Sequence, residues 1–305
     1  MPVIQAVGLV KRYGRGRDAK TALAGLDLAV EEGEVFGYLG PNGAGKTTTL
    51  RLMLDFIRPT AGNIRVFGDD PRDNASVRDR VGYLAGDFVA NRKQTSRELL
   101  TFLGDLRGGV PAKRVEEMAD RFDLDLSRRI GDLSKGNRQK VGLVQAFMHD
   151  PALLVLDEPT SGLDPFLQQH FIELVREASA NGQTVFMSSH VLSEVQATCH
   201  RVAIIREGQL VTVANVDELR EQAHRRVEIT FAGEVAAAEF AALPSLRNAT
   251  VSQAAGGGTV LRALLSGTPD ALVKAAASHE VTGLLAEEPD LEELFFTFYQ
   301  PGGQS

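Results

Sequence analysis

A glycine-rich loop constrains the fold of this chain more than any other feature of its sequence. Residues 40–47 read GPNGAGKT, which fits G-x-x-x-x-G-K-[ST] between a strand-like run, EVFGYLG, and a helix expected to begin near Lys46. Glycines let the backbone fold around phosphate groups, so that several N–H groups and the positive end of the helix point at the anion. We expect the Lys46 ammonium to bind the β- and γ-phosphates of a nucleotide, and the Thr47 hydroxyl to bind Mg²⁺. The predicted nucleotide-binding residues of the loop are Gly40, Pro41, Asn42, Gly43, Ala44, Gly45, Lys46, Thr47 and Thr48.

Two carboxylates follow a second strand-like run. Residues 153–157 (LLVLD) are apolar up to Asp157, and Glu158 comes next. In folds with this type of loop, an apolar strand that ends in Asp brings a second metal-binding oxygen beside the phosphates. We therefore predict that Asp157 binds Mg²⁺ and that Glu158 is the general base that activates water, an effect typically of about 10²–10⁴ in rate. The alternative is a solvated Asp-Glu pair at the end of a strand, which the neighbouring loop disfavours.

Residues 1–222 read as alternating strands and helices, which predicts an α/β domain with a mostly parallel sheet covered on both sides. The stretches VIQAVGLV, LDLAV and EVFGYLG predict an early antiparallel layer. Further strands are expected at 153–157, 184–189 and 201–207, and a small helical insert at about 90–145. One face of an expected helix carries Leu167, Phe171, Leu174, Val175 and Ala178.

Residues 223–305 restart the pattern in the order β-α-β-β-α-β, which is the ferredoxin-like arrangement and predicts a small α+β accessory domain. Modules of this fold can sense a small ligand, which by itself is only fold analogy. A final helix would place Leu291, Leu294, Phe295 and Phe298 on one stripe. That stripe could dock onto its own domain or contact a second copy of the chain.

Charge and cysteine content exclude several classes of protein. The formal net charge is −7, which argues against a dedicated nucleic-acid binder. A single cysteine, Cys199, rules out an intramolecular disulfide framework and fits a reducing cytoplasm. No secretory signal and no apolar run of about 20 residues is seen, so we expect a soluble chain that reaches a membrane only through a partner.

A third motif points to one family. Residues 133–139 read LSKGNRQ, where Ser134 is a natural helix N-cap and Gly136 allows close approach of backbone to a ligand. A helix N-terminus with a hydroxyl is a second phosphate-binding device. The motif resembles the LSGGQ signature of ABC transporter ATP-binding subunits, and the resemblance covers residues 2 to about 222. It implies a P-loop ABC ATPase core that dimerises head to tail, in which Ser134 and Gly136 close over the ATP bound by the opposite subunit.

The resemblance assigns three further site residues. Asp164, in the sequence SGLD, matches the D-loop at the dimer interface of this family. His190 matches the switch histidine that contacts the γ-phosphate and orients the attacking water. Tyr13 matches the aromatic residue that stacks on adenine, which needs no base-specific hydrogen bond. The cofactors implied are ATP and Mg²⁺. The partners implied are a separately encoded integral-membrane permease and a second ATPase subunit, with the chain on the cytoplasmic face of the membrane.

The sequence departs from the family pattern at one position. Where the family usually has a glutamine that reaches Mg²⁺, this chain has Gly86, followed by Asp87, which we predict to bind the metal instead. The form SKGNRQK and the tail EEPDLEELFFTFY resemble ATPase subunits of two-component exporters of drugs, antibiotics and polysaccharides. An alternative function is a soluble regulatory switch that binds ATP with low turnover.

Overall fold

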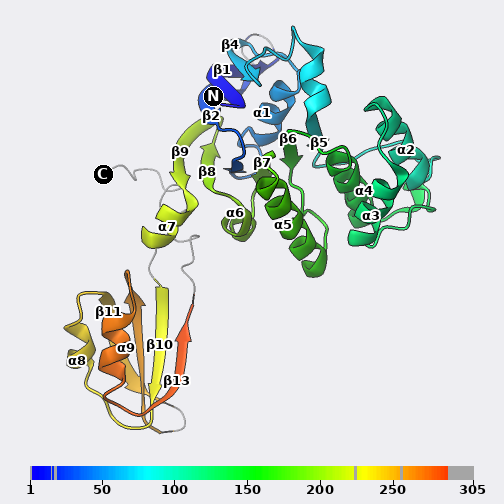
Figure 1. Ribbon diagram of the computed structural model, residues 1–305. Helices are drawn as coiled ribbons and strands as arrows, with labels where there is room; N and C mark the ends of the chain where they lie inside the picture. Colours follow the sequence, from blue (N-terminus) through cyan, green and yellow to red (C-terminus); the bar gives the residue numbers. More distant parts are fainter. Residues whose placement is uncertain (1, 15, 17–18, 223–224, 255–256, 288–305) are drawn as a thin grey trace. The chain divides into compact units, whose positions relative to one another are not determined.

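A six-stranded, mainly parallel sheet forms the centre of the first part of the chain (Figure 1). The computed structural model describes residues 2–14, 16, 19–222, 225–254 and 257–287. The strand order is β5-β6-β7-β3-β8-β9, and the pairs β5–β6, β6–β7, β7–β3 and β3–β8 are parallel. Every residue of β3, β6 and β7 is buried, because helices or other strands cover both faces of the sheet. The strands are β3 (Val35–Leu39), β5 (Val81–Leu84), β6 (Leu153–Asp157), β7 (Thr184–Ser189), β8 (Arg201–Arg206) and β9 (Gln209–Asn215).

An antiparallel layer of three strands opens the chain, in the order β2-β1-β4. These strands are β1 (Ile4–Tyr13), β2 (Lys20–Val30) and β4 (Ala61–Val66). The antiparallel layer was predicted, but the assignment of EVFGYLG to it was wrong. That run forms β3 in the parallel sheet. Its five residues are buried without alternation, a pattern that belongs to a strand covered on both faces rather than to a half-exposed antiparallel one.

Helices cover the two faces of the parallel sheet. On one face, α1 (Lys46–Met53) packs between this sheet and the antiparallel layer, in a core that includes Phe36 and Tyr38 of β3. On the other face lie α5 (Pro165–Ala180) and α6 (Leu192–Thr198), and α6 contacts β3 and β7. The residues that α5 buries are those of the predicted stripe, Leu167, Phe171, Leu174, Val175 and Ala178. The predicted α/β core is therefore confirmed.

Three helices form the region between β5 and β6: α2 (Ser96–Leu106), α3 (Ala112–Arg121) and α4 (Lys135–Phe147). Short 3-10 helices η2 (Ala75–Arg80) and η3 (Ile130–Asp132) precede β5 and α4. α2 begins with a capping box, in which Thr95 and Glu98 each bind the other's backbone N–H. α4 packs on β5 as well as on α2 and α3, so it connects this helical region to the parallel sheet.

Contacts divide the chain into two compact units, Met1–Ala214 and Asn215–Ser305. The boundary expected from sequence was 222/223. The observed division comes earlier, so that the short helix α7 (Val216–Gln222) belongs to the second unit. The second unit has the element order β10 (Arg225–Phe231), α8 (Ala237–Ala241), β11 (Leu246–Gln253), β12 (Thr259–Leu265), α9 (Asp270–Ala276) and β13 (Val281–Ala286). Its antiparallel sheet has the order β11-β12-β10-β13, which is ferredoxin-like.

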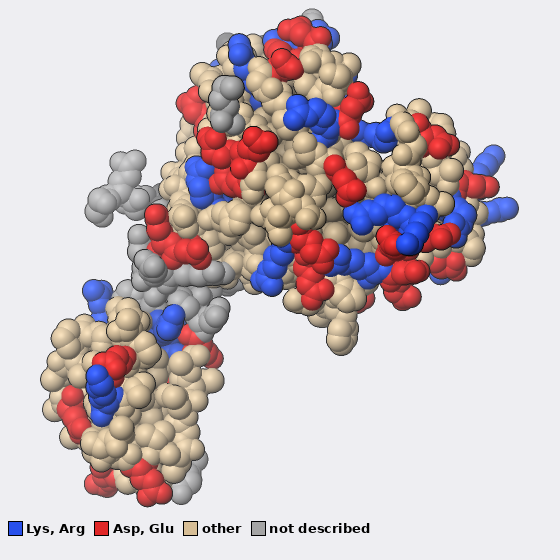
Figure 2. Space-filling view, in the orientation of Figure 1, with Lys and Arg blue, Asp and Glu red and all other residues tan. Residues whose placement is uncertain are grey.

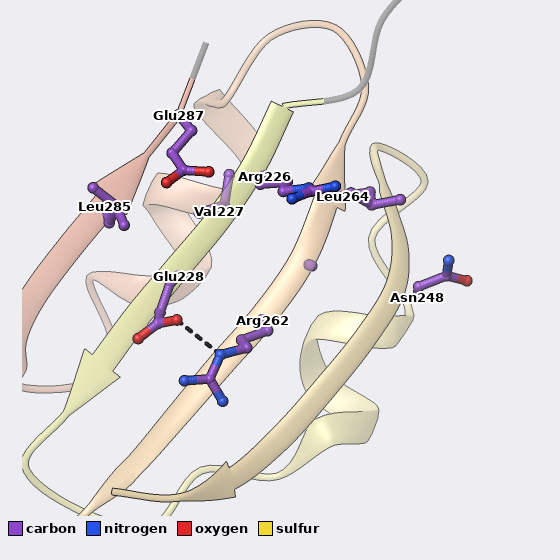
Figure 3. Close-up of a pocket in the computed structure, with 9 residues that line it drawn as sticks. Arg226, Val227, Glu228, Asn248, Arg262, Leu264, Leu285 and Glu287 are labelled. Carbon is purple, nitrogen blue, oxygen red and sulfur yellow. Dashed lines mark hydrogen bonds and ion pairs between the residues drawn. The ribbon is translucent and has the colours of Figure 1, made fainter. Parts of the chain in front are cut away.

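The core of the second unit lies on one face of its sheet. Val227, Ile229 and Phe231 pack there with Phe240 of α8 and Leu272 of α9. The alternate residues of the same strands point to the opposite face, where they border a cavity of about 380 Å³ (Figure 3). In it the Arg262 Nε donates to the Glu228 Oε2 at 2.8 Å. The stripe Leu291, Leu294, Phe295 and Phe298 lies outside the described residues.

Charges of both signs are interspersed on the face of the first unit shown in Figure 2. In the part of the chain that the structure describes, this face carries no continuous basic stripe. No helix among the described residues combines the length and the apolar character needed to cross a membrane.

Candidate nucleotide-binding site

The glycine-rich loop joins β3 to α1 in a conformation that requires glycine. Gly43 and Gly45 have φ values of 82° and 114°, in the left-handed region where other residues are strained. A Cβ atom on Gly45 would lie 2.7 Å from the Ala22 carbonyl oxygen, and one on Gly40 would lie 2.4 Å from that of Ile205. The loop therefore packs against β2 and β8 too closely for any larger side chain at these positions.

Lys46 is the first residue of α1, and its ammonium turns back into the loop. Its side chain is buried, and its Nζ donates to the Gly40 carbonyl oxygen at 2.6 Å. The same Nζ lies 3.1 Å from the Glu158 Oε1. A buried ammonium needs partners of this kind, because burial of an unpaired charge is costly. Nucleotide phosphates would compete with Glu158 for this cation.

Asp157 lies at the end of β6, beside the hydroxyl that was predicted to share a metal with it. The Thr47 Oγ1 donates to the Asp157 Oδ2 at 2.8 Å, and the Ser188 Oγ donates to the Asp157 Oδ1 at 2.5 Å. Asp157 is buried, and a buried carboxylate needs hydrogen-bond donors, which these two hydroxyls supply. One carboxylate and one hydroxyl suit Mg²⁺, which binds few protein oxygens and completes its octahedron with phosphates and water.

Glu158 follows Asp157 with a left-handed backbone, φ 49°. Its N–H donates to the carbonyl oxygen of Ser188 at 3.1 Å, and its carbonyl oxygen accepts from the Gln139 Nε2 at 3.2 Å. Its carboxylate lies between two side chains, Lys46 and His190, and the His190 Nδ1 is 2.6 Å from the Glu158 Oε2. Glu158 and His190 are thus brought together at the same end of the sheet as the loop.

A cavity of about 330 Å³ adjoins these residues. It is lined by the loop, Glu158, Tyr13 of β1 and three residues of β2, which are Lys20, Thr21 and Ala22. The Tyr13 ring is partly exposed, and the Lys11 Nζ lies 5.2 Å from its centre. Sequence reasoning missed the β2 residues. The signal that could have found them is the β1–β2 pairing, which places Lys20 opposite Tyr13.

Three residues of the signature and the D-loop that were predicted to bind nucleotide, Ser134, Gly136 and Asp164, lie outside the cavity beside Tyr13. Ser134 caps α4, its Oγ accepting from the Asn137 N–H at 3.2 Å, and Asp164 caps α5 by accepting from the N–H groups of the two residues Phe166 and Leu167. A Cβ on Gly136 would lie 2.5 Å from the Gly162 carbonyl oxygen, so glycine is needed there for packing within the chain. Ser134, Gly136 and Asp164 do not line the cavity beside Tyr13.

Gly86 lies beside the carboxylate of Asp157. A Cβ on Gly86 would lie 3.4 Å from the Asp157 Oδ2, whereas Asp87 is exposed. Within the described ranges, no cluster of three His, Cys, Asp or Glu side chains suited to a metal is found.

The Asp157 carboxylate also affects Tyr83 of β5. Burial, followed by the charge of Asp157, raises the pKa of Tyr83 to about 12, so its phenol stays neutral.

Comparison with known proteins identifies the class of this protein. Residues 23–161 match the family model described as ABC transporter. The chain is similar to the linearmycin resistance ATP-binding protein LnrL of Bacillus subtilis, with 30% identity over 96% of this chain and 97% of that protein. It is also similar to the daunorubicin resistance ATP-binding protein DrrA3 of Streptomyces coeruleorubidus, with 34% identity over 94% of this chain and 93% of that protein.

Among solved structures, an ATP-binding subunit of an ABC transporter superposes with a TM-score of 0.64 and 28% identity, over 72% of this chain and 92% of that one. The dimeric structure of MJ0796, a bacterial ABC transporter cassette, shares the fold with a TM-score of 0.64 and 23% identity, over 70% of this chain and 98% of that one. The fold and the loop define an ATPase of the P-loop class. More narrowly, the chain belongs to the family of ABC transporter ATP-binding proteins, as the sequence motifs predicted.

Proposed function

We propose that this chain is the ATP-hydrolysing subunit that energises export of a compound through a separately encoded membrane permease. The observation that carries the proposal is the meeting of Thr47–Asp157 and Lys46–Glu158–His190 at one end of the parallel sheet. The export role is supported by the full-length similarity to proteins named for resistance to linearmycin and daunorubicin. Such a subunit would lie on the cytoplasmic face of the membrane.

The chemistry follows from the side chains present. Lys46 and the loop N–H groups would hold the phosphates of ATP, while Tyr13 would stack on the adenine. Thr47 and Asp157, with Asp87 as a further candidate, would hold Mg²⁺, which supplies charge neutralisation on the phosphates. Glu158 would take a proton from the attacking water, and His190, in contact with the same carboxylate, would orient that water.

The complete site would form between two copies of the chain. Ser134 and Gly136 lie at the start of α4, outside the cavity that their own chain forms beside Tyr13. We infer that they close over the ATP of a second subunit, with Asp164 at the interface. ATP binding would then draw two subunits together, and loss of the γ-phosphate would release them.

Steady-state ATP hydrolysis by the purified chain tests the proposal, with Glu158→Gln measured in parallel. We expect wild-type activity to rise more steeply than linearly with protein concentration, because two copies build each site. Glu158→Gln should bind ATP but lose about 10²–10⁴ of the rate, because the amide cannot accept the proton. Glu116→Gln, an exposed carboxylate of α3, is the matched control and should keep full activity.

Rapid hydrolysis by Glu158→Gln would contradict the assignment of the base. ATP binding without turnover by the wild type, even with its permease present, would favour the alternative of a low-turnover regulatory switch. Efflux of a drug from cells that express the chain together with a permease, and no efflux with Glu158→Gln, tests the export role itself.

A further inference from the structure

A buried carboxylate next to the site has no role in the chemistry described above. Glu194 lies in the first turn of α6, and its side chain is only 8% exposed. Its Oε1 accepts a short hydrogen bond from the Thr160 Oγ1, and its Oε2 accepts from the Ser189 Oγ at 2.9 Å. A buried carboxylate is costly unless its oxygens are satisfied, and here two hydroxyls satisfy one oxygen each.

The two hydroxyls belong to the two segments that carry the predicted catalytic pair. Thr160 follows Glu158 by two residues, and Ser189 directly precedes His190. Both Thr160 and Ser189 are buried, so the bridge through Glu194 is shielded from water. Hydrogen bonds to an ionised carboxylate are stronger than neutral ones, especially away from solvent.

The segment that holds His190 is tied further to the same group. The Ser189 Oγ that donates to Glu194 also accepts from the N–H of Val191 at 2.9 Å, which closes a tight turn around His190. The Thr198 Oγ1 donates to the carbonyl oxygen of Glu194 at 2.7 Å, and so connects it to the end of α6. The backbone of Glu194 is therefore fixed by a bond within α6, while its side chain binds the segments that contain Thr160 and Ser189.

We infer that Glu194 is a positioning residue that holds the Glu158 segment and the His190 segment as one unit. Glu158 and His190 lie in two separate segments, one after β6 and one after β7. The 2.6 Å contact between the Glu158 Oε2 and the His190 Nδ1 requires these segments to stay in a fixed relative position. Glu194 is a direct side-chain bridge between these segments. The inference rests on the proposed roles of Glu158 and His190. It adds a residue that does not line the cavity beside Tyr13.

The test is ATP hydrolysis by Glu194→Ala and Glu194→Gln in the full chain, with kcat and KM measured separately. We expect Glu194→Ala to lower kcat by about 10- to 100-fold, because small misplacement of catalytic groups has effects of that order. KM for ATP should change less than about threefold, because the cavity and the loop are untouched. Glu194→Gln keeps the shape and one acceptor, so it should recover a large part of kcat. Ser193→Ala, an exposed neighbour on α6, is the control.

Equal loss of kcat and of ATP affinity in Glu194→Ala, or unchanged kcat, would overturn the inference. If Glu194→Ala does not fold, Thr160→Val decides, because it removes one arm of the bridge and keeps the side-chain volume. In that case kcat should fall with KM preserved, and a normal kcat would overturn the inference. In a double-mutant cycle, Thr160→Val should have little further effect once Glu194 is alanine, and full additivity would contradict the bridge. A wild type that stays inactive even with its permease present would instead contradict the proposed function, so the two failures are distinguishable.

Discussion

Single residues at the site are held by contacts that a bound nucleotide would have to rearrange. The Lys46 ammonium is shared between the Gly40 carbonyl oxygen and the Glu158 carboxylate, and that carboxylate also contacts His190. Phosphate oxygens would take over Lys46 and leave Glu158 with His190 alone. If Lys46 and Glu158 have the proposed roles, the same cation would bind the phosphates and control when the base is available.

At this scale we predict that Lys46→Ala weakens ATP binding by at least about tenfold. A charge-assisted hydrogen bond to phosphate typically contributes about 1.5–3 kcal/mol, and alanine removes it. Titration with a fluorescent ATP analogue measures the dissociation constant. Lys113→Ala, an exposed lysine of α3, is the matched control. An unchanged affinity of Lys46→Ala would contradict the assignment of the loop.

At the scale of elements, the site depends on how closely α6 approaches β3. A Cβ on Gly37 of β3 would lie 2.9 Å from the Val195 Cγ1 and 3.0 Å from the Cys199 Sγ. Glycine at this position therefore lets α6 lie directly against the sheet. Because α6 carries Glu194, this packing also sets where the bridge to Thr160 and Ser189 lies.

We predict that Gly37→Ala lowers the free energy of unfolding of the first unit by about 1–3 kcal/mol, because overpacking forces α6 away from the sheet. Urea denaturation measures the change. Ser193→Ala, at an exposed position of α6 in the same unit, should have a much smaller effect. Equal midpoints for Gly37→Ala and the wild type would show that α6 adjusts without cost.

At the scale of the whole molecule, the proposal gives each chain a part in two sites. A chain would supply its phosphate-binding loop to one site of the dimer and its signature, with Ser134, to the other. In a head-to-tail homodimer, a Lys46→Ala chain retains its signature and a Ser134→Arg chain retains its phosphate-binding loop. Each variant alone should be inactive. A mixed dimer would contain one intact site and one that lacks both halves.

We therefore predict that mixing equal amounts of the two inactive variants restores about a quarter of wild-type activity, since half of the dimers are mixed and half of their sites are intact. ATP hydrolysis of the mixture, compared with each variant alone, measures this. No recovery, with both variants folded, would contradict the homodimer and point to a different ATPase chain as the partner.

Much of the fold and the separate motifs could be read from the sequence by itself. The phosphate-binding loop needs glycines and a lysine at set spacings, and a buried strand needs a continuous apolar run, so local physics marks both. The α5 stripe was predicted residue by residue, because helical periodicity alone decides which face is buried.

Only the tertiary structure decided which layer β3 joins, that β2 lines the cavity, and that Gly136 is needed against Gly162. It alone showed the bridge from Glu194 to Thr160 and Ser189. The physical reason is that these features depend on contacts between segments far apart in the chain. Spacing and periodicity describe what a segment does locally, whereas sheet order and packing decide which segments meet.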